Sequence, residues 1–328
     1  VAGKDFIVHA QSGAGEIDLK VVDLKYALKI KEKARNKIVV FREGLPAAIQ
    51  EDPRQRELYS EKGRDAYKLD ALEKVSPAAV IIIKKKLTAS LRPDSYPFPI
   101  IEIQKDAFPD KKIKLAHIKV DSDIQDINTQ NVLGYLPGRG DSDSVIVLTG
   151  HYDHLGGYSD AIFRGANDNA SGSSMLLSIA EHFSKDRPYH NMLFIAFGAE
   201  EAGLQGSSYY VFKDPRVELS SMKFLLNLDL MGNGVDGIMA VGGKNFPKQF
   251  KLLEEVNENL GAVPVVRARQ NAPNSDHYFF LENGVPGFFI YTMGGPTHYH
   301  DIYDNAQNLQ FSRYVEVRQL LIEFLNRL

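Results

Sequence analysis

The part of the chain after about residue 145 alternates between two hydrophobic patterns. Short, continuous apolar runs typical of buried strands occur at residues 145–149, 192–197, 224–228 and 287–291. Segments whose apolar residues have helical spacing occur at about 171–183, 204–211, 246–259 and 311–328. Because strands and helices follow one another in turn, we expect a largely parallel sheet packed between layers of helices.

A different pattern comes just before this region. Residues 112–120 alternate between apolar and polar side chains, as an antiparallel edge strand does. Residues 131–136 have a similar composition and follow a polar loop. We therefore expect the two segments to pair as a hairpin.

The first 110 residues or so predict a separate small domain. The predicted strands of this part are 37–41, 79–83 and 97–103, and its predicted helix is 67–74. The charged segment 47–64 predicts a mobile surface loop. At 328 residues the chain exceeds the usual single-domain length of about 100–200 residues, so we expect two domains, 1–110 and 111–328.

Composition narrows the class of protein. Hydrophobic residues make up 44% of the chain and charged residues 25%, which is ordinary for a globular protein. The formal net charge of -3 gives no reason to expect nucleic acid or an anionic membrane as a partner. The chain has no cysteine, which excludes disulfides and thiolate metal ligands. No apolar run approaches the roughly 18 residues of a transmembrane helix, so we expect no membrane-spanning segment.

Acidic and imidazole side chains stand where the predicted strands end. The five candidate ligands are His151, Asp168, Glu201, Asp229 and His300. Ligands of open α/β sheets gather at the carboxyl ends of the strands. Five nitrogen and oxygen ligands, one of them a carboxylate able to bridge, suit two zinc-like ions. Glu200, the neighbour of Glu201, then remains as a base beside the ions.

Several of these residues also have explanations that involve no metal. Asn, Asp and Ser cap helices well, so Asp168 also fits a helix N-terminus. Adjacent carboxylates such as Glu200 and Glu201 are common in the first turn of a helix. An ionised Asp229 after an apolar strand is costly unless it is paired or bound to metal, which favours a ligand role there.

For each of the two candidate histidine ligands, a second histidine nearby in the sequence is an alternative ligand. His154 lies near His151, and His298 lies near His300. Asp153, two residues after His151, supplies the carboxylate to which a metal-bound imidazole usually gives its second N–H. His154 has no such carboxylate two residues later.

Taken in order, five motifs resemble the M28 family of two-zinc aminopeptidases and carboxypeptidases. They are Gly150-His-Tyr-Asp153, Gly165-Ala-Asn-Asp-Asn-Ala-Ser-Gly172, Ala199-Glu-Glu-Ala-Gly203, Asn227-Leu-Asp229 and Tyr299-His300-x-x-x-Asp304. Ser275-Asp-His277 and Phe279 also match a recurring stretch of that family. The resemblance covers about residues 112–328, and residues 1–110 resemble the protease-associated domain that many members carry.

The resemblance implies a fold and a set of ligands. The fold would be a three-layer α/β sandwich of the zinc exopeptidase type, with a mostly parallel mixed sheet between helices, plus a small α+β domain. Asp168 would bridge two Zn²⁺ ions, for which Co²⁺ or Mn²⁺ are alternatives. His151 and Asp229 would complete one site, and Glu201 and His300 the other. The spacing to Asp304 selects His300 over His298.

The resemblance also implies catalytic roles. Glu200 would be the general base, and Asp153 would hold His151. Tyr299 would steady the scissile carbonyl, as in some members; others have a tyrosine three residues before the Ser-Asp-His stretch, where this chain has Ala272. The peptide bond from Asp168 to Asn169 would be cis.

The expected activity is that of an aminopeptidase acting on peptides, in which Glu200 takes a proton from a water shared by the metals. A carboxypeptidase would need arginines for the terminal carboxylate, and Arg164 is the only arginine between His151 and the predicted helix 171–183. A glutaminyl-cyclase-like acyl transferase would work with one metal, and an inactive binding module would have lost ligands. The resemblance implies a secreted or periplasmic protein and leaves the oligomeric state open.

Overall fold

The computed structural model describes residues 1–23, 34–44, 65–109, 113–141 and 143–328. These residues form two compact units. The first contains Val1–Asp126 and the short segment Gly157–Ile162, and the second contains Ile127–Gly156 and Phe163–Leu328. The predicted loop 47–64 lies outside the described residues. Within them, no helix is both long and apolar enough to cross a membrane.

Among the described residues, the first unit contains a six-stranded mixed sheet against which the short helix α4 packs. Its strands are β1 (Phe6–Val8), β2 (Gly15–Asp23), β3 (Ile38–Arg42), β4 (Ala79–Lys84), β5 (Ile100–Gln104) and β6 (Leu115–Val120), in the order β1-β5-β4-β3-β2-β6. The helix α4 (Ala66–Glu73) buries Leu69 and Leu72 against Phe41 and Ile82 of the sheet. The β-branched runs predicted to be strands therefore form the centre of this unit.

The predicted hairpin between residues 112–120 and 131–136 was wrong. β6 is antiparallel to β2 in the first unit, whereas β7 (Val132–Leu136) is antiparallel to β11 (Asn191–Phe197) in the second. Ile118 and Val120 of β6 are buried in the same apolar cluster as strands β3 and β4. Their partners lie far away in sequence, so local alternation could not identify them. The predicted domain boundary after residue 110 accordingly falls before strand β6, which belongs to the first unit.

The second unit is built on a seven-stranded sheet. The strands beyond β7 and β11 are β8 (Val145–His151), β12 (Met222–Leu228), β13 (Gly237–Val241), β14 (Val266–Arg269) and β15 (Gly287–Met293). The order is β14-β13-β15-β12-β8-β11-β7. The neighbours from β15 to β11 pair in parallel, and the pairs β11–β7 and β13–β15 are antiparallel. This confirms the predicted mostly parallel mixed sheet.

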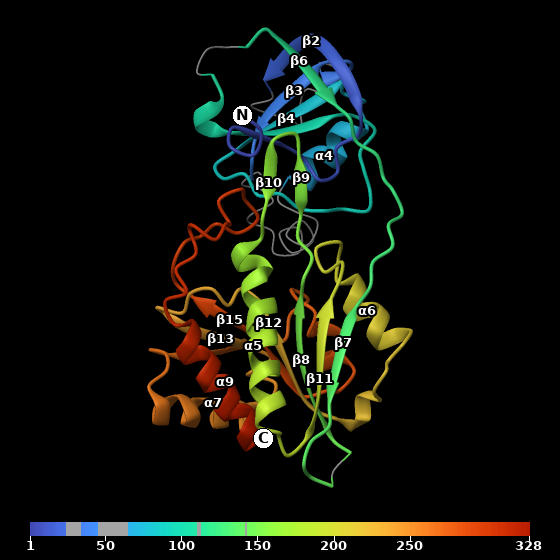
Figure 1. Ribbon diagram of the computed structural model, residues 1–328. Helices are drawn as coiled ribbons and strands as arrows, with labels where there is room; N and C mark the ends of the chain where they lie inside the picture. The colour runs from blue at the N-terminus through green and yellow to red at the C-terminus, as the bar shows by residue number, and fades with distance from the viewer. Residues whose placement is uncertain (24–33, 45–64, 110–112, 142) are drawn as a thin grey trace. The chain divides into compact units, whose positions relative to one another are not determined.

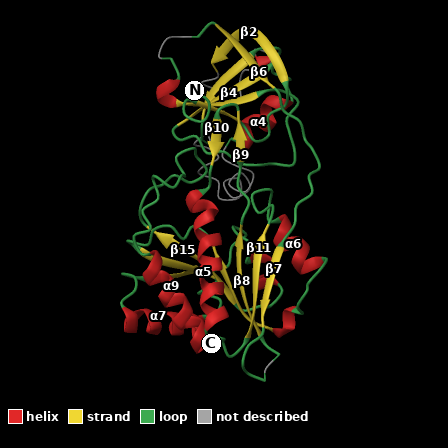
Figure 2. Cartoon of the chain, viewed as in Figure 1, coloured by secondary structure: helices red, strands yellow, loops and turns green. Residues whose placement is uncertain are grey.

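Helices cover both faces of this sheet (Figure 1). They are α5 (Gly172–Lys185), α6 (Gln205–Phe212), α7 (Pro247–Leu260), α8 (Tyr278–Glu282) and α9 (Tyr314–Arg327). Ile146 and Leu148 of β8 share an apolar cluster with α5, α7 and α9. Val145 and Val147, which point to the other face, share one with α6 and α8. Figure 2 shows helices on either side of the sheet, which confirms the three-layer sandwich.

A short segment of the chain after β8 belongs to the first unit and not to this sandwich. The short strands β9 (Gly156–Tyr158) and β10 (Ala161–Phe163) pair with each other, and Gly157–Ile162 groups with the first unit. The hydroxyl of Tyr158 donates a hydrogen bond to the backbone carbonyl of Phe6, at 3.1 Å. The chain then returns to the second unit through the turn η3 (Ala166–Ser171).

Candidate metal centre

The structure brings all five predicted ligands together at the carboxyl ends of the strands. His151 is the last residue of β8, Asp229 directly follows β12, and Glu201 follows β11 by four residues. His300 follows β15, and Asp168 lies within the turn η3. Four strand ends and one turn thus converge on a single point of the sheet edge, as open α/β sheets predict.

The ligand atoms form two groups that share Asp168. Nε2 of His151 lies 3.2 Å from Oδ1 of Asp168 and 3.5 Å from Oδ1 of Asp229. Nε2 of His300 lies 3.0 Å from Oδ2 of Asp168 and 3.2 Å from Oε2 of Glu201. Each oxygen of Asp168 therefore faces a different imidazole, which is the arrangement that a bridging carboxylate requires.

Burial tests whether these residues fit metal ions. Nε2 of His151 and Oδ1 of Asp229 are buried, and neither has a hydrogen-bond partner of favourable geometry among the described residues. Buried polar atoms are nearly always paired, so these two require a partner. The donors are imidazole nitrogens and carboxylate oxygens, which bind zinc and similar divalent ions. The residues present therefore fit metal ions.

His154 belongs to this cluster as well. Its Nδ1 lies 2.7 Å from Oε1 of Glu201, and its ring packs edge-on against His300 with centroids 5.7 Å apart. Ligand atoms of His154, Asp168 and Glu201 are close enough to surround one ion. The sequence motif identified His154 only as a competitor of His151. The structure instead separates the two histidines, with one beside each half of the cluster.

Two further carboxylates position the backbone of the site. The carboxylate of Asp153 accepts the backbone N–H groups of Glu200 and Glu201, at 3.1 and 3.2 Å. Nδ1 of His151 lies closer to the backbone carbonyl of Asp153, at 3.1 Å, than to its carboxylate, at 3.8 Å. Asp153 thus holds His151 through its main chain, while its side chain fixes the two neighbouring glutamates.

Asp304 holds the backbone at Asp168, the proposed bridging ligand, in a similar way. Its carboxylate accepts the backbone N–H groups of Asn167 and Asp168, at 2.7 and 3.0 Å. The sequence motif included Asp304 only for its spacing from His300. The structure gives that spacing a physical reason, because a single loop carries both His300 and the group that holds Asp168 in place.

Two buried polar side chains were missed as contributors to the site. Nδ2 of Asn169 donates to the carbonyls of Leu228 and His151, at 3.0 and 3.3 Å, and so ties the ends of β12 and β8 together. The hydroxyl of Ser275 donates to Oδ2 of Asp229 at 2.9 Å and accepts a hydrogen bond from Asn227. These contacts orient the ligands from behind, as partners of metal ligands usually do.

The backbone at the site is unusual. Ala199, Leu230 and His300 have φ values of 58°, 62° and 55°. Residues other than glycine rarely adopt this left-handed conformation, and such outliers concentrate at functional sites. Each of the three lies at or beside a candidate site residue. The peptide bond from Asp168 to Asn169 is cis, which confirms the prediction from the resemblance.

Electrostatics at the cluster follow from burial and close charges. Burial, together with nearby carboxylates such as Asp229, raises the pKa of Glu200 to about 9, although His151 opposes the shift. Burial alone would lower the pKa of His300, but Asp168 and Glu201 outweigh it and raise that pKa to about 10. The same opposition leaves the pKa of His151 well above its usual value.

An open cavity of about 210 Å³ gives access to the cluster. It is lined by Asp168, Glu200, Asp229, Leu230, Arg269, Asn274, Phe289, Tyr291 and Tyr299. The ring of Tyr299 stacks on that of His300, with centroids 3.8 Å apart. Burial and the neighbouring carboxylates raise the pKa of Tyr299, so its hydroxyl keeps its proton and can donate a hydrogen bond.

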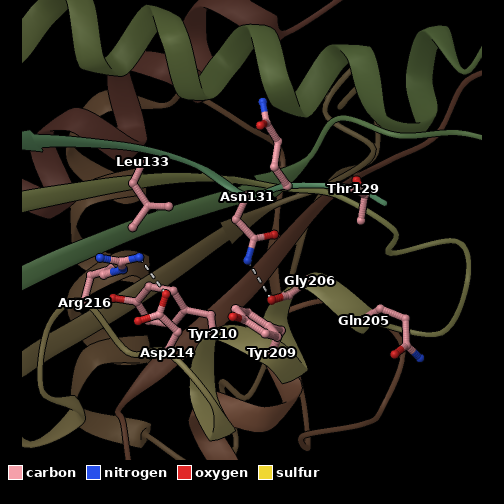
Figure 3. A pocket seen from close by; sticks show the side chains of 10 residues that line it. Thr129, Asn131, Leu133, Gln205, Gly206, Tyr209, Tyr210, Asp214 and Arg216 are labelled. Carbon is pink, nitrogen blue, oxygen red and sulfur yellow. Dashed lines mark hydrogen bonds and ion pairs between the residues drawn. The ribbon is translucent and has the colours of Figure 1, made fainter. Parts of the chain in front are cut away.

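A second, larger cavity of about 430 Å³ lies between the edge strand β7 and helix α6 (Figure 3). None of the candidate site residues lines it. Its charged residues Asp214 and Arg216 are paired with each other at 2.7 Å, and Asn131 donates to the carbonyl of Gly206. The chemistry expected from the sequence therefore belongs to the smaller cavity.

Comparison with known proteins agrees with this geometry. The sequence model described as Peptidase family M28 matches residues 131–325. Aminopeptidase YwaD from Bacillus subtilis is 29% identical over 247 residues, which cover 70% of this chain and 49% of the relative. The chain thus spans about half the length of this curated relative.

Solved structures share the fold. The zinc aminopeptidase BSAP from Bacillus subtilis superposes with a TM-score of 0.75 over 98% of this chain and 78% of its own, at 22% identity. A glutaminyl cyclase from Bacteroides thetaiotaomicron superposes with a TM-score of 0.52 over 60% of this chain and 77% of its own, at 21% identity. Because proteins named for different reactions share this fold, the fold alone does not identify the reaction.

Proposed function

The chain belongs to peptidase family M28, and on that premise we propose that it is a two-zinc aminopeptidase that hydrolyses the N-terminal peptide bond of peptides. The observation that carries the proposal is the division of the cluster into two groups of ligand atoms around the two oxygens of Asp168. His151 and Asp229 would hold one ion, and Glu201 and His300 the other. The printed names of YwaD and BSAP, both aminopeptidases, support the same reaction.

The side chains around the cavity supply what the reaction needs from the protein. Zinc ions bound at such a centre polarise the scissile carbonyl and lower the pKa of water to about 7. Glu200 lines the cavity and is the group that accepts the proton of the attacking water. Positive charge beside a carboxyl group lowers its pKa, so the raised pKa of Glu200 falls toward neutrality when cations are present. Glu200 then returns the proton to the leaving nitrogen.

The cavity also suits a substrate with a free amine. Asp168 and Asp229 line it beside Glu200, so ions held by these ligands would be open to the cavity and would offer the free amine a binding partner. Tyr299 lines the same cavity with a protonated hydroxyl, and we assign it the donation of a hydrogen bond to the substrate carbonyl.

A carboxypeptidase is the second candidate, and one observation favours it. Arg269 lines the cavity, so an arginine that could bind a terminal carboxylate lies at the site although it is far from His151 in the sequence. A glutaminyl cyclase would use one metal, and the two complete ligand groups argue for two. An inactive binding module would have lost ligands, and the described residues retain all five.

Two further proposals rest on the family resemblance alone. We propose that the first unit is a protease-associated domain, and that the protein is secreted or periplasmic. Cell fractionation of the source organism tests the location directly. Deletion of the first unit, followed by kinetics on short and long peptides, tests whether that unit influences substrate range.

The experiment that tests the proposed activity uses matched chromogenic substrates. Leucine p-nitroanilide, which has a free amine, should be hydrolysed, and N-acetyl-leucine p-nitroanilide should not. A chelator should abolish the activity, added Zn²⁺ should restore it, and elemental analysis should find two ions per chain. Cleavage of the acetylated substrate, or of peptides from the C-terminus, would contradict an aminopeptidase. A single ion per chain would contradict the two-zinc centre.

A further inference from the structure

Arg269 is the cation among the described residues that line the candidate active-site cavity. It is the last residue of β14, its side chain is exposed, and it faces the same space as Asp168, Glu200 and Asp229. Its Nη1 donates a hydrogen bond to the hydroxyl of Tyr291, at 3.3 Å. The guanidinium group therefore has a fixed neighbour within the cavity.

The guanidinium group of Arg269 is not paired with a carboxylate among the described residues. No described carboxylate lies within 4.0 Å of its guanidinium group, whereas Arg216, Arg313 and Arg327 each have one within that distance. Its hydrogen bond to Tyr291 is made to a neutral hydroxyl and occupies one of five N–H donors. Most of its hydrogen-bonding capacity is therefore available to a ligand.

We propose that Arg269 and Tyr291 form a subsite that binds a carboxylate of the substrate. A guanidinium group presents two parallel N–H donors that match the two oxygens of a carboxylate. The hydroxyl of Tyr291 accepts from Arg269, so its own proton is directed elsewhere and can be donated to the same ligand. The inference rests on the proposed function, because it concerns which peptides that activity selects.

The surroundings of the subsite suit an acidic side chain. Phe289 is buried and packs against Tyr291 with ring centroids 5.4 Å apart, which gives the cavity an apolar wall beside the guanidinium group. A glutamate side chain combines an apolar stem with an anionic end. The other charged lining residues, Asp168, Glu200 and Asp229, are all acidic. Arg269 is therefore the side chain among the described lining residues that can pair with the carboxylate of a substrate.

A carboxylate can reach this subsite from two sources. One is the side chain of an N-terminal Asp or Glu residue, and the other is the C-terminal carboxylate of a dipeptide. The two share the chemistry recognised by Arg269, and matched substrates separate them. Glutamate and glutamine p-nitroanilides differ only in the side-chain charge, and leucylglycine and leucylglycinamide differ only in the terminal charge.

The test compares the wild-type, zinc-loaded protein with Arg269→Met and with the control Arg267→Met. Arg267 lies on the same strand, is exposed, and does not line the cavity. We expect the wild type to favour the charged member of at least one pair by about 10–100-fold in kcat/KM, as charged hydrogen bonds allow. Arg269→Met should lose that preference, and Arg267→Met should keep it. The pair that responds identifies the source of the carboxylate.

Calorimetric binding of L-glutamate and L-glutamine provides a readout that does not require turnover. If no substrate is hydrolysed, the proposed function fails, and tighter binding of glutamate that depends on Arg269 still supports the subsite. Equal effects of the two arginine substitutions, or a charge preference unchanged in Arg269→Met, would overturn the subsite. A wild type with no preference in kinetics or binding would overturn it as well.

Discussion

Nδ1 of His154 lies 2.7 Å from Oε1 of Glu201, while the other oxygen of that carboxylate, Oε2, lies near His300. The contact to His154 therefore fixes the rotation of the Glu201 carboxylate and directs Oε2 into the cluster. The ring of His154 is confined as well, because a Cβ atom at Gly165 would lie 2.6 Å from it. Gly165 has φ of 61°, which also favours glycine at this position.

His154→Ala should weaken one of the two proposed metal sites. Removal of a side chain that orients a ligand typically costs about 10–100-fold in metal affinity. Competition with a chromogenic chelator should show this loss for one ion and little change for the other. His298→Ala is the matched control, because His298 lies outside both ligand groups. Equal losses in the two variants would contradict an orienting role for His154.

Metal binding near neutral pH should release protons. The pKa of His300 is raised to about 10 and that of His151 lies well above its usual value, so both imidazoles carry protons at pH 7 before metal binds. An imidazole must be neutral to bind a metal, so each must lose its proton. Zinc affinity should therefore increase with pH.

Titration calorimetry at pH 7 in buffers of different ionisation enthalpy measures this release. A heat of zinc binding that does not depend on the buffer would contradict it. The folding stability of the metal-free protein should depend on pH in the opposite sense and decrease as the pH rises. The ion pairs of His300 stabilise that protein fully below pH 6.5, and the contribution is lost as the pH rises through about 10.

The fold could be predicted from the sequence where local pattern and packing agree. Runs such as 145–149 and 224–228 are mostly apolar because parallel strands are covered on both faces, and they form the centre of the sheet. The strand β14, Val-Arg-Ala-Arg, gave no such signal, since it is a short edge strand with exposed charges. Its place in the sheet depends on pairing with β13, which local sequence does not encode.

Some residues of the candidate site could be predicted from the sequence, and others could not. Three of the predicted ligands, His151, Glu201 and Asp229, follow a predicted apolar strand within four residues, whereas Asp168 and His300 were identified by the motifs around them. The position of Arg269 at the cavity could not be predicted from the sequence. It depends on where β14 lies in the strand order of the sheet. The contact between His154 and Glu201 joins residues 47 positions apart and has no local signal.

In the first unit, Glu102 should make stability depend on pH. Its side chain is buried, and burial raises its pKa to about 7, against the opposing charge of Lys84. Between its usual pKa of 4.5 and pH 7, the folded protein holds a proton that the unfolded chain has lost. Stability therefore falls as the pH rises through that window, and the ionised carboxylate is unfavourable above it.

Glu102→Gln removes this titration. Lys84 keeps its ion pair with Asp65 at 2.7 Å, so the amide does not leave the lysine alone. The free energy of unfolding of the variant, relative to that of the wild type, should therefore increase from pH 4.5 to pH 8, by on the order of 3 kcal/mol at most. Denaturant unfolding at the two pH values measures the gain, and the exposed Glu73→Gln serves as control. A difference independent of pH would contradict the assignment.

The adjacent residues Glu200 and Glu201 have separate roles in the proposed mechanism. Glu201 is a predicted ligand, whereas Glu200 lines the cavity and is proposed to move the proton. Glu201→Gln should lose affinity for one ion, because a neutral amide is a poor zinc ligand.

The most direct measurement is the turnover of Glu200→Gln on leucine p-nitroanilide, with its metal content determined on the same sample. The amide keeps the shape of the side chain but cannot accept a proton, so kcat should fall by at least about 10²–10⁴-fold. The metal content should equal that of the wild type. Wild-type turnover in Glu200→Gln, or loss of metal from it, would contradict the role assigned to Glu200.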